Sequence, residues 1–298
     1  MSVTSILIKR NIKLFFKDKG MFFTSLITPA ILLVLYATFL GNIYKDSFLA
    51  SLPPMFELSE GIIDGLVGSQ LMSSILAVSC VTVAFCSNFL MVQDKVNGTI
   101  KDLRMSPVKS SVISISYYIA TFVSTLLICL TATAICLVHI AFVGWYMSVA
   151  DVFLLTLDVF LLVLFGTALS SIINMFLSTQ GQLSAVGTIV SAGYGFICGA
   201  YMPIYSFSEG LQKVLMFLPG SYGTSLVRNH SMRGVLSEIE SEGVPSEVIS
   251  SIMDSLDCNL YFSDNQVELP VMYVILGASI VVLVGAFILI NAVKKNKA

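Results

Sequence analysis

Two ionisable side chains, Asp158 and His139, fall within long apolar segments of this 298-residue chain. Asp158 lies about 10 Å from the outer end of its segment, at a rise of 1.5 Å per residue. His139 lies at a similar depth in the preceding segment, and the tight turn between the two segments could bring them together. An acid at membrane depth is a candidate proton relay or cation contact. The alternative is a purely structural polar pair. Asn174, near the other end of the same segment as Asp158, is a third intramembrane polar residue.

The sequence lacks the motifs of common catalytic sites. No G-x-x-x-x-G-K-[ST] motif is present to hold ATP phosphates, and HExxH and GxSxG are also missing. No Cys/His spacing indicates a metal site, although Cys258 could form an intermolecular disulfide. We therefore predict no catalytic residue, metal site or cofactor in this chain. The net charge of −2 gives no indication of nucleic-acid binding.

The composition places most of the chain in lipid. Hydrophobic residues make up 56% and charged residues 11%, whereas soluble domains carry about 25% charged residues. A membrane-spanning helix needs about 20 predominantly apolar residues. Six segments meet this need: 21–41, 63–92, 111–143, 151–177, 183–203 and 270–293. We predict an all-α membrane protein with one transmembrane domain, residues 1–298.

The distribution of lysine and arginine predicts the orientation. Basic residues gather before the first span, between the second and third spans, and after the sixth. They are Lys9, Arg10, Lys13, Lys17, Lys19, Lys95, Lys101, Arg104, Lys109, Lys294, Lys295 and Lys297. These segments are an even number of crossings apart, and cytoplasmic segments carry the excess of basic residues. We therefore expect both termini to be cytoplasmic and the acidic segment 229–269 to be an extracellular loop.

Two regions outside the spans show helical periodicity. Residues 3–19 place Ile8, Ile12 and Phe15 on one face and basic residues opposite, which predicts an amphipathic helix in the inner headgroup plane. In the outer loop, residues 246–256 repeat apolar side chains at helical spacing. Together with a second short helix ended by Gly243, they predict a small helical cap.

Residues 94–107 form a short polar segment between the second and third spans. Gly98 permits a sharp turn, Thr99 and Asp102 have the spacing of a capping box, and Pro107 ends the helix. The apolar positions are Ile100 and Leu103. A helix this short is unstable alone, so it needs a surface, either a partner protein or the inner headgroups.

Small residues recur along the second and fifth spans. Such residues let helix backbones approach closely. The alternative is that they line a translocation path between two copies of the chain. The candidate path residues are Ser69, Ser73, Gly187, Ser191 and Gly195.

The segment 94–107 resembles the permeases of type-2 ATP-binding-cassette (ABC) exporters of drugs and polysaccharides. Those proteins carry an acidic residue, then Gly-Thr-[Leu/Ile]-[Glu/Lys]-x-Leu and a proline. The matching residues here are Asp94, Gly98, Thr99, Ile100, Lys101, Leu103 and Pro107. After the fifth span the family shows a Gly, a Pro, an apolar helix, a second Pro, an aromatic residue and an Arg. The matching residues are Gly199, Pro203, Leu211, Phe217, Pro219, Tyr222 and Arg228.

This resemblance covers nearly the whole chain and implies a function. Residues 94–107 would be a cytoplasmic coupling helix seated on a separate ATPase subunit, although Val96 replaces a second acid often found in that motif. Residues 200–226 would form a re-entrant helical hairpin before the sixth span. Two ATPase subunits, which bind ATP and Mg, and a second permease chain, identical or similar, would complete an exporter in a prokaryotic cytoplasmic membrane.

The expected cargo is lipophilic or amphipathic: a drug, an antibiotic peptide or a lipid-like molecule, in keeping with multidrug or peptide resistance. Two other classes stay open from the sequence. A proton-coupled secondary transporter would use Asp158 and His139, but no inverted repeat is visible. A non-transporting membrane receptor or immunity protein would use the outer loop 229–269.

Overall fold

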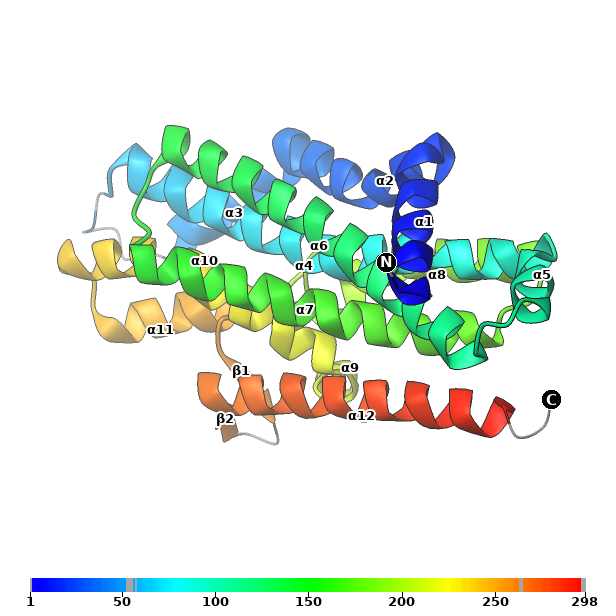
Figure 1. Cartoon of the computed structure of the whole chain (residues 1–298). Coiled ribbons are helices and arrows are strands. Elements are labelled where there is room, and N and C mark those ends of the chain that lie inside the picture. The colour runs from blue at the N-terminus through cyan, green and yellow to red at the C-terminus, as the bar shows by residue number, and fades with distance from the viewer. Residues whose placement is uncertain (1, 52–55, 57, 263–264, 296–298) are drawn as a thin grey trace.

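The computed structural model describes residues 2–51, 56, 58–262 and 265–295, so Lys297 of the predicted basic C-terminus lies outside the description. The chain forms an elongated helical bundle with one small β-hairpin (Figure 1). Its first elements are α1 (Val3–Lys17), α2 (Lys19–Leu35), the π-helical η1 (Tyr36–Leu40), α3 (Gly41–Ser51), α4 (Glu60–Val96), α5 (Thr99–Met105), α6 (Ser110–Val143), α7 (Val149–Phe176) and α8 (Gln180–Ile197). There follow the 3-10 turn η2 (Ile204–Ser206), α9 (Glu209–Leu215), α10 (Pro219–Ser241), α11 (Ser246–Ser255), β1 (Leu260–Phe262), β2 (Asn265–Val267) and α12 (Leu269–Lys295).

The helix α4 is the centre of the bundle. Every residue from Met72 to Val92 is buried, because α2, α6, α7, α8 and α10 all pack against this helix. A helix that is apolar all round is typically buried on all sides. The outer helices instead keep apolar faces exposed, as α12 does at Val274, Val281 and Val282. The bundle therefore has the arrangement of a protein whose outer surface faces lipid.

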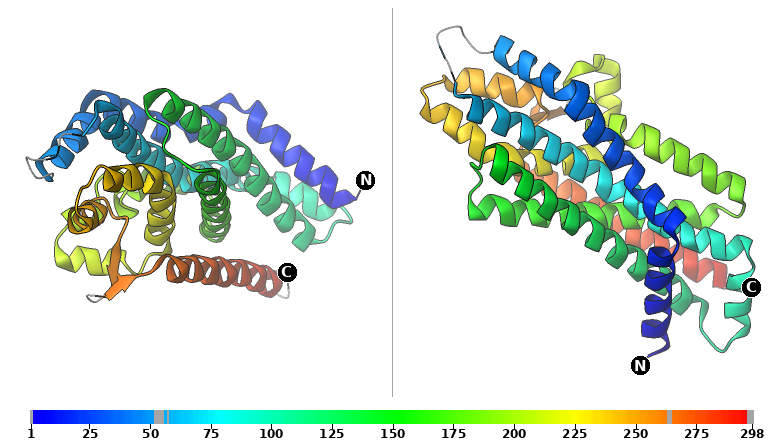
Figure 2. Two further views of the ribbon diagram at one scale, coloured as in Figure 1. Left: turned by 90° about the vertical axis from the view of Figure 1, so that its left-hand side faces the viewer. Right: turned by 90° about the horizontal axis from the view of Figure 1, so that it is seen from above.

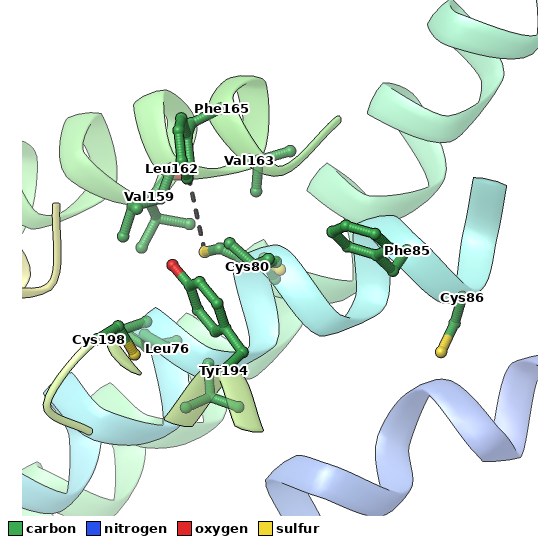
Figure 3. Close-up of a cluster of buried hydrophobic side chains, with 14 of the residues drawn as sticks. Leu76, Cys80, Phe85, Cys86, Val159, Leu162, Val163, Phe165, Tyr194 and Cys198 are labelled. Atoms are coloured by element: carbon green, nitrogen blue, oxygen red, sulfur yellow. Dashed lines mark hydrogen bonds between the residues drawn. The ribbon is translucent and has the colours of Figure 1, made fainter. Parts of the chain in front are cut away.

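The contact between α4 and α7 depends on a glycine. A Cβ added at Gly166 would lie 2.7 Å from the carbonyl oxygen of Cys80, so only glycine allows this approach. Beside it, the Cys80 thiol lies 3.8 Å from the Val159 carbonyl oxygen, and Tyr194 of α8 packs into the same cluster (Figure 3). The cluster brings α7 and α8 together against the central helix.

Five helical segments among the described residues are long and apolar enough to cross a membrane. They are Lys19–Leu49, Glu60–Val96, Ser110–Val143, Val149–Phe176 and Leu269–Asn291. The expected fifth span is not among them. It corresponds to α8, whose first turn carries Gln180 and Gln182 and which ends at Ile197 rather than at the predicted residue 203.

The outer loop differs from its prediction in one helix. The short helix that we expected before Gly243 is the continuous end of α10, while α11 lies within the predicted 246–256. A hairpin of β1 and β2, which the sequence did not predict, pairs Leu260 with Val267. Cys258 is 1% exposed, and burial raises the pKa of its thiol to about 12. An intermolecular disulfide at Cys258 is therefore not available in this fold.

The two ends of the bundle are formed by different elements. In Figure 1, α5, the connection of α7 to α8 and the last turn of α12 lie at one end, which we call the inner end. The end of α10 and the helix α11 lie at the other, the outer end. Helix α1 crosses the bundle steeply rather than running along it (Figure 2). Its buried face is Leu7, Asn11 and Phe15, so Phe15 lies on the predicted side.

Candidate functional site

The turn between α4 and α5 depends on Gly98. This residue has a φ of 82°, in the left-handed region that residues with a side chain disfavour. Gly98 is also the residue before the first helical position, and no side chain caps α5. The predicted capping box of Thr99 and Asp102 is therefore wrong: Thr99 is already inside the helix, and a capping hydroxyl must come from the preceding residue.

Helix α5 has one face packed on the chain and one face in solvent. Ile100 is 9% exposed and Leu103 is partly buried, and both pack against the core of this chain. The exposed face carries Lys101, Asp102, Arg104 and Met105, and Met105 is 81% exposed. Of the predicted docking residues, Lys101 and Pro107 are thus at the surface. Ile100 is an internal contact instead, because it anchors α5 to the bundle.

Asp94 is also internal, and it joins three helices. Its Oδ2 atom accepts a hydrogen bond from Arg10 Nη1 of α1 at 2.8 Å, and a second from the hydroxyl of Tyr117 in α6. Arg10 also donates to Asn11 Oδ1 at 2.8 Å. Burial lowers the pKa of Arg10, but the hydrogen bond and the charge of Asp94 outweigh burial and raise it overall. Asp94 is 6% exposed, so its partners in this structure lie within the chain; its part in ATPase docking stays a prediction.

The neighbouring Lys95 ties α4 to the end of α7. Its Nζ donates to the carbonyl oxygens of Asn174 at 3.0 Å, Met175 at 2.9 Å and Leu177 at 3.1 Å. The last carbonyls of a helix have no partner within the helix, and a cation there also interacts favourably with the helix dipole. Asn174 is fully buried; its backbone carbonyl accepts from Lys95, whereas its side-chain amide has no partner among the described residues.

Sequence reasoning missed Arg10, Tyr117 and Lys95 as members of this site. Arg10 was one of several basic residues on the polar face of an amphipathic helix, and nothing in its spacing marks it as the partner of a residue 84 positions away. Lys95 could have been identified from the sequence, because it stands beside Asp94 at the end of a long predicted helix. The site therefore consists of an exposed α5 face and a buried network that connects it to α1, α6 and α7.

A cavity of about 1150 Å³ lies along the bundle between α2, η1, α4 and α8; we call it the groove. It extends from Asp18 and Gln93 near the inner end to Tyr201 and Met202. Its lining is mostly apolar and includes Ile27, Ile31, Leu35, Phe39, Phe89 and Phe196, with Thr24, Thr28, Ser184 and Thr188 as hydroxyl residues.

The groove contains two of the five predicted path residues. Gly187 and Ser191 of α8 line it. Ser69 and Ser73 are 3% and 0% exposed, so they lie within the bundle and the path prediction is wrong for them. Gly195 is covered by the ring of Tyr201, which lies 2.4 Å from where a Cβ would be. The serines of α4 are buried because neighbours surround this helix on every side.

The intramembrane acid has a different partner from the predicted one. Asp158 Oδ2 lies 2.6 Å from His230 Nδ1 of α10, and Asp158 Oδ1 accepts from the hydroxyl of Tyr273 in α12 at 2.5 Å. His139 is exposed on α6. The predicted Asp158–His139 pair is therefore wrong, because α6 and α7 turn these two side chains in different directions. Asp158 instead joins α7, α10 and α12.

The predicted hairpin residues lie around a second ion pair. Arg228, 0% exposed, donates from Nη2 to the Gly199 carbonyl oxygen at 2.9 Å and from Nη1 to Asp257 Oδ2 at 3.3 Å. The carboxylate of Asp257 accepts from the backbone N–H groups of Ile204 at 2.5 Å and Tyr205 at 3.0 Å. Burial raises the pKa of Asp257, against the opposing charge of Arg228. This network fixes the chain after α8.

The other predicted hairpin residues, Pro203, Pro219 and Tyr222, lie beside η2 or in the first part of α10. Pro219 occupies the first turn of α10, where its missing N–H costs nothing. The hydroxyl of Tyr222 donates to the Met216 carbonyl oxygen at 2.7 Å, and Pro203 is buried beside η2. The last part of the predicted hairpin, up to residue 226, is the first part of α10, which continues to Ser241.

The fold and this site define a multi-pass membrane protein with a short, partly exposed helix, α5, at one end. A family model described as ABC-2 type transporter matches residues 2–230. The chain therefore belongs to the ABC-2 type transporter family, whose members are the membrane components of ABC transporters while ATP hydrolysis takes place in a separate subunit. The searches of curated proteins and of solved structures found no match.

Proposed function

We propose that this chain is the permease subunit of an ATP-driven exporter and that α5 is the helix through which an ATPase subunit drives it. The observation that carries the proposal is the two-sided packing of α5. Ile100 and Leu103 hold one face to the bundle, while Lys101, Arg104 and Met105 project from the other. A seven-residue helix has little stability of its own, so this geometry suits a rigid contact for a partner.

The network behind α5 supports a route for force. Displacement of α5 acts directly on the end of α4, which runs the length of the bundle. Through Asp94 it also acts on α1, and through Lys95 on α7. Charge-assisted hydrogen bonds are stronger than neutral ones, so these helices would move with α4. The groove lies between α2, α4 and α8, so such a movement would change its width.

The rest of the transporter follows from the same proposal. Helix α8 would be the fifth of six spans, and residues 200–226 would form the re-entrant hairpin. The basic inner end and both termini would be cytoplasmic, in a prokaryotic cell membrane. Two ATPase subunits and a second permease chain would complete the complex, and the groove would carry a lipophilic or amphipathic cargo outward.

The test is a charge reversal on α5. We would co-purify the permease with a candidate ABC ATPase, reconstitute both in proteoliposomes and measure ATP-dependent movement of a fluorescent lipophile. The double variant Lys101→Glu/Arg104→Glu should lose ATPase binding and transport and keep its unfolding temperature, because both side chains are exposed. The exposed Lys213→Glu on α9 is the control. Full coupled transport by the double variant would overturn the proposal.

A further inference from the structure

A second, smaller cavity adjoins the outer end of the groove. Its volume is about 360 Å³, and it lies between α3, the segment 201–206 and α11; we call it the outer pocket. The two cavities share Leu40, Ile43, Tyr201 and Met202. The two cavities are therefore adjacent, and these four residues lie where they meet.

The lining of the outer pocket combines hydroxyl groups with apolar surface. The hydroxyl residues are Tyr44, Ser47, Tyr201, Tyr205, Ser206 and Ser255. The apolar residues are Leu40, Ile43, Phe48, Met202, Pro203, Ile252 and Leu256. Within the described part of the chain, no Asp, Glu, Lys, Arg or His lines this pocket. Neutral hydrogen-bonding groups of a ligand can thus be satisfied there, whereas a charged group would find no counterion.

The nearest buried charges lie behind the pocket wall and are already paired. Asp257 accepts from the N–H groups of Ile204 and Tyr205, whose backbone forms that wall, and it binds Arg228. Arg228 in turn donates to Gly199. Neither Arg228 nor Asp257 is among the residues that line the pocket.

The groove itself has the same electrostatic character. Among the described residues, Asp18 is the one Asp, Glu, Lys, Arg or His that lines the groove; it stands at the inner end and accepts from the Met21 N–H at 3.0 Å as the cap of α2. Taking a charge out of water costs several kcal/mol unless a partner compensates it. The groove, from its inner end to the outer pocket, therefore disfavours a ligand with a charged group.

We propose that the groove and the outer pocket form one site for an amphiphile with an uncharged, hydroxyl-rich headgroup, the apolar part lying in the groove and the headgroup under α11. This inference rests on the proposed function, because it names the class of cargo for that path. Apolar pockets with a few well-placed polar groups are typical of small-molecule sites. The hydroxyls of Tyr201 and Ser255 already donate to the carbonyl oxygens of Ser191 and Ile252, but each oxygen can still accept a hydrogen bond from a headgroup, and Tyr205 and Ser206 add further hydroxyls.

The first experiment compares headgroups on one tail. The full-length permease in lipid nanodiscs is photolabelled with three alkyl diazirine probes that carry a maltoside, a sulfate or a trimethylammonium group, and labelled peptides are identified by mass spectrometry. The maltoside probe should label α3, α8 and residues 201–206, about tenfold more than either charged probe, a ratio that corresponds to 1.4 kcal/mol. Unlabelled dodecyl maltoside should compete.

Charge variants of Ser206 sharpen the test. Ser206 lines the pocket and is exposed, so a larger side chain is tolerated. Ser206→Lys should shift labelling toward the sulfate probe, and Ser206→Asp toward the trimethylammonium probe. Ser250→Lys, on the exposed face of α11 outside the pocket, is the matched control and should change nothing.

Three outcomes would overturn the inference. Equal labelling by all three probes would show that the headgroup is not recognised. Labelling abolished by excess phosphatidylcholine would assign the site to bilayer lipid, and no labelling, with cross-links between two copies across the groove, would assign it to a second chain. None of these outcomes bears on the α5 variants. Loss of transport in Lys101→Glu/Arg104→Glu would still support the permease function. Normal transport in that variant would overturn the permease function, whatever the probes show.

Discussion

The inner and outer ends of the molecule each contain an arginine–aspartate pair, and the two pairs differ in burial. At the inner end, the Arg10 and Asp94 side chains are 29% and 9% exposed and 2.8 Å apart. At the outer end, the Arg228 and Asp257 side chains are 0% and 5% exposed and 3.3 Å apart. The inner pair joins a surface helix to the bundle. The outer pair holds backbone segments together deep in the protein.

From this difference we infer that the inner ion pair can open during a movement, whereas the outer ion pair stays closed. When the inner pair opens, Arg10 can regain water and Asp94 keeps the hydrogen bond from Tyr117, so α1 can shift against α4. When the outer pair opens, both charges stay in an apolar environment, and a buried ion pair with one partner removed is strongly destabilising. We therefore expect movement at the inner end and a fixed wall at the outer end.

The largest effect should follow from breaking the outer pair. Arg228→Met leaves Asp257 buried without its cation, and we expect a loss of about 3–5 kcal/mol in the free energy of unfolding. The measurement is denaturant-induced unfolding of the purified protein in mixed micelles. Glu247→Gln, an exposed change on α11, is the control. A loss below about 1 kcal/mol would show that the pair is solvated like a surface salt bridge.

The inner pair should give a smaller loss of stability with a local signature. In Asp94→Asn the charge-assisted hydrogen bond to Arg10 is weakened, and we expect a loss of about 1–3 kcal/mol. Hydrogen exchange should rise in α1 while α10 stays protected. If α1 keeps its protection from hydrogen exchange in Asp94→Asn, the distinction between a movable inner ion pair and a fixed outer ion pair is wrong.

A substitution in the turn before α5 should lower the free energy of unfolding by a still smaller amount. Gly98→Ala introduces a side chain at positive φ where no atom obstructs it, so the cost is the backbone strain alone, about 1–2 kcal/mol. Gly181→Ala also meets open space, with no positive φ, and serves as the control. Equal unfolding free energies for the two variants would show that residue 98 does not need the left-handed conformation.

The exposed face of α5 should matter least for stability. Met105→Ala should change the unfolding free energy by no more than about 0.5 kcal/mol, because the side chain is 81% exposed. The buried Ile100→Ala should cost about 2–5 kcal/mol. The comparison uses the same denaturation assay, and a larger loss for Met105→Ala would mean that α5 packs by its other face.

Local sequence features predicted much of the fold. Composition and helical period predicted the spans that became α4, α6, α7 and α12, and also α1, α11 and the short helix after Gly98. They failed at Thr99, where the conformation of the preceding glycine shifted the start of the helix by one residue. They also placed the end of the fifth span too late, because the chain turns away at Gly199, where φ is 74°.

The partners of the polar residues were beyond prediction. The sequence marked Asp94, Asp158 and Arg228 as unusual, since each is a charge beside or within apolar segments. It placed Asp94 in a docking segment and gave no partner for it within the chain. It suggested His139 as the partner of Asp158, and that pairing was wrong. Asp94 binds Arg10, and Asp158 binds His230 and Tyr273.

The sequence by itself determined which segments are apolar, which ends are basic and that a short helix follows Gly98, because hydropathy, charge and turn geometry are properties of neighbouring residues. The tertiary structure alone decided which side chains of α4 are enclosed, which charges pair and where a groove remains. Those outcomes depend on how each helix is rotated about its axis. That rotation is fixed by packing all the helices at once, as the contact of Gly166 with Cys80 fixes α7 on α4.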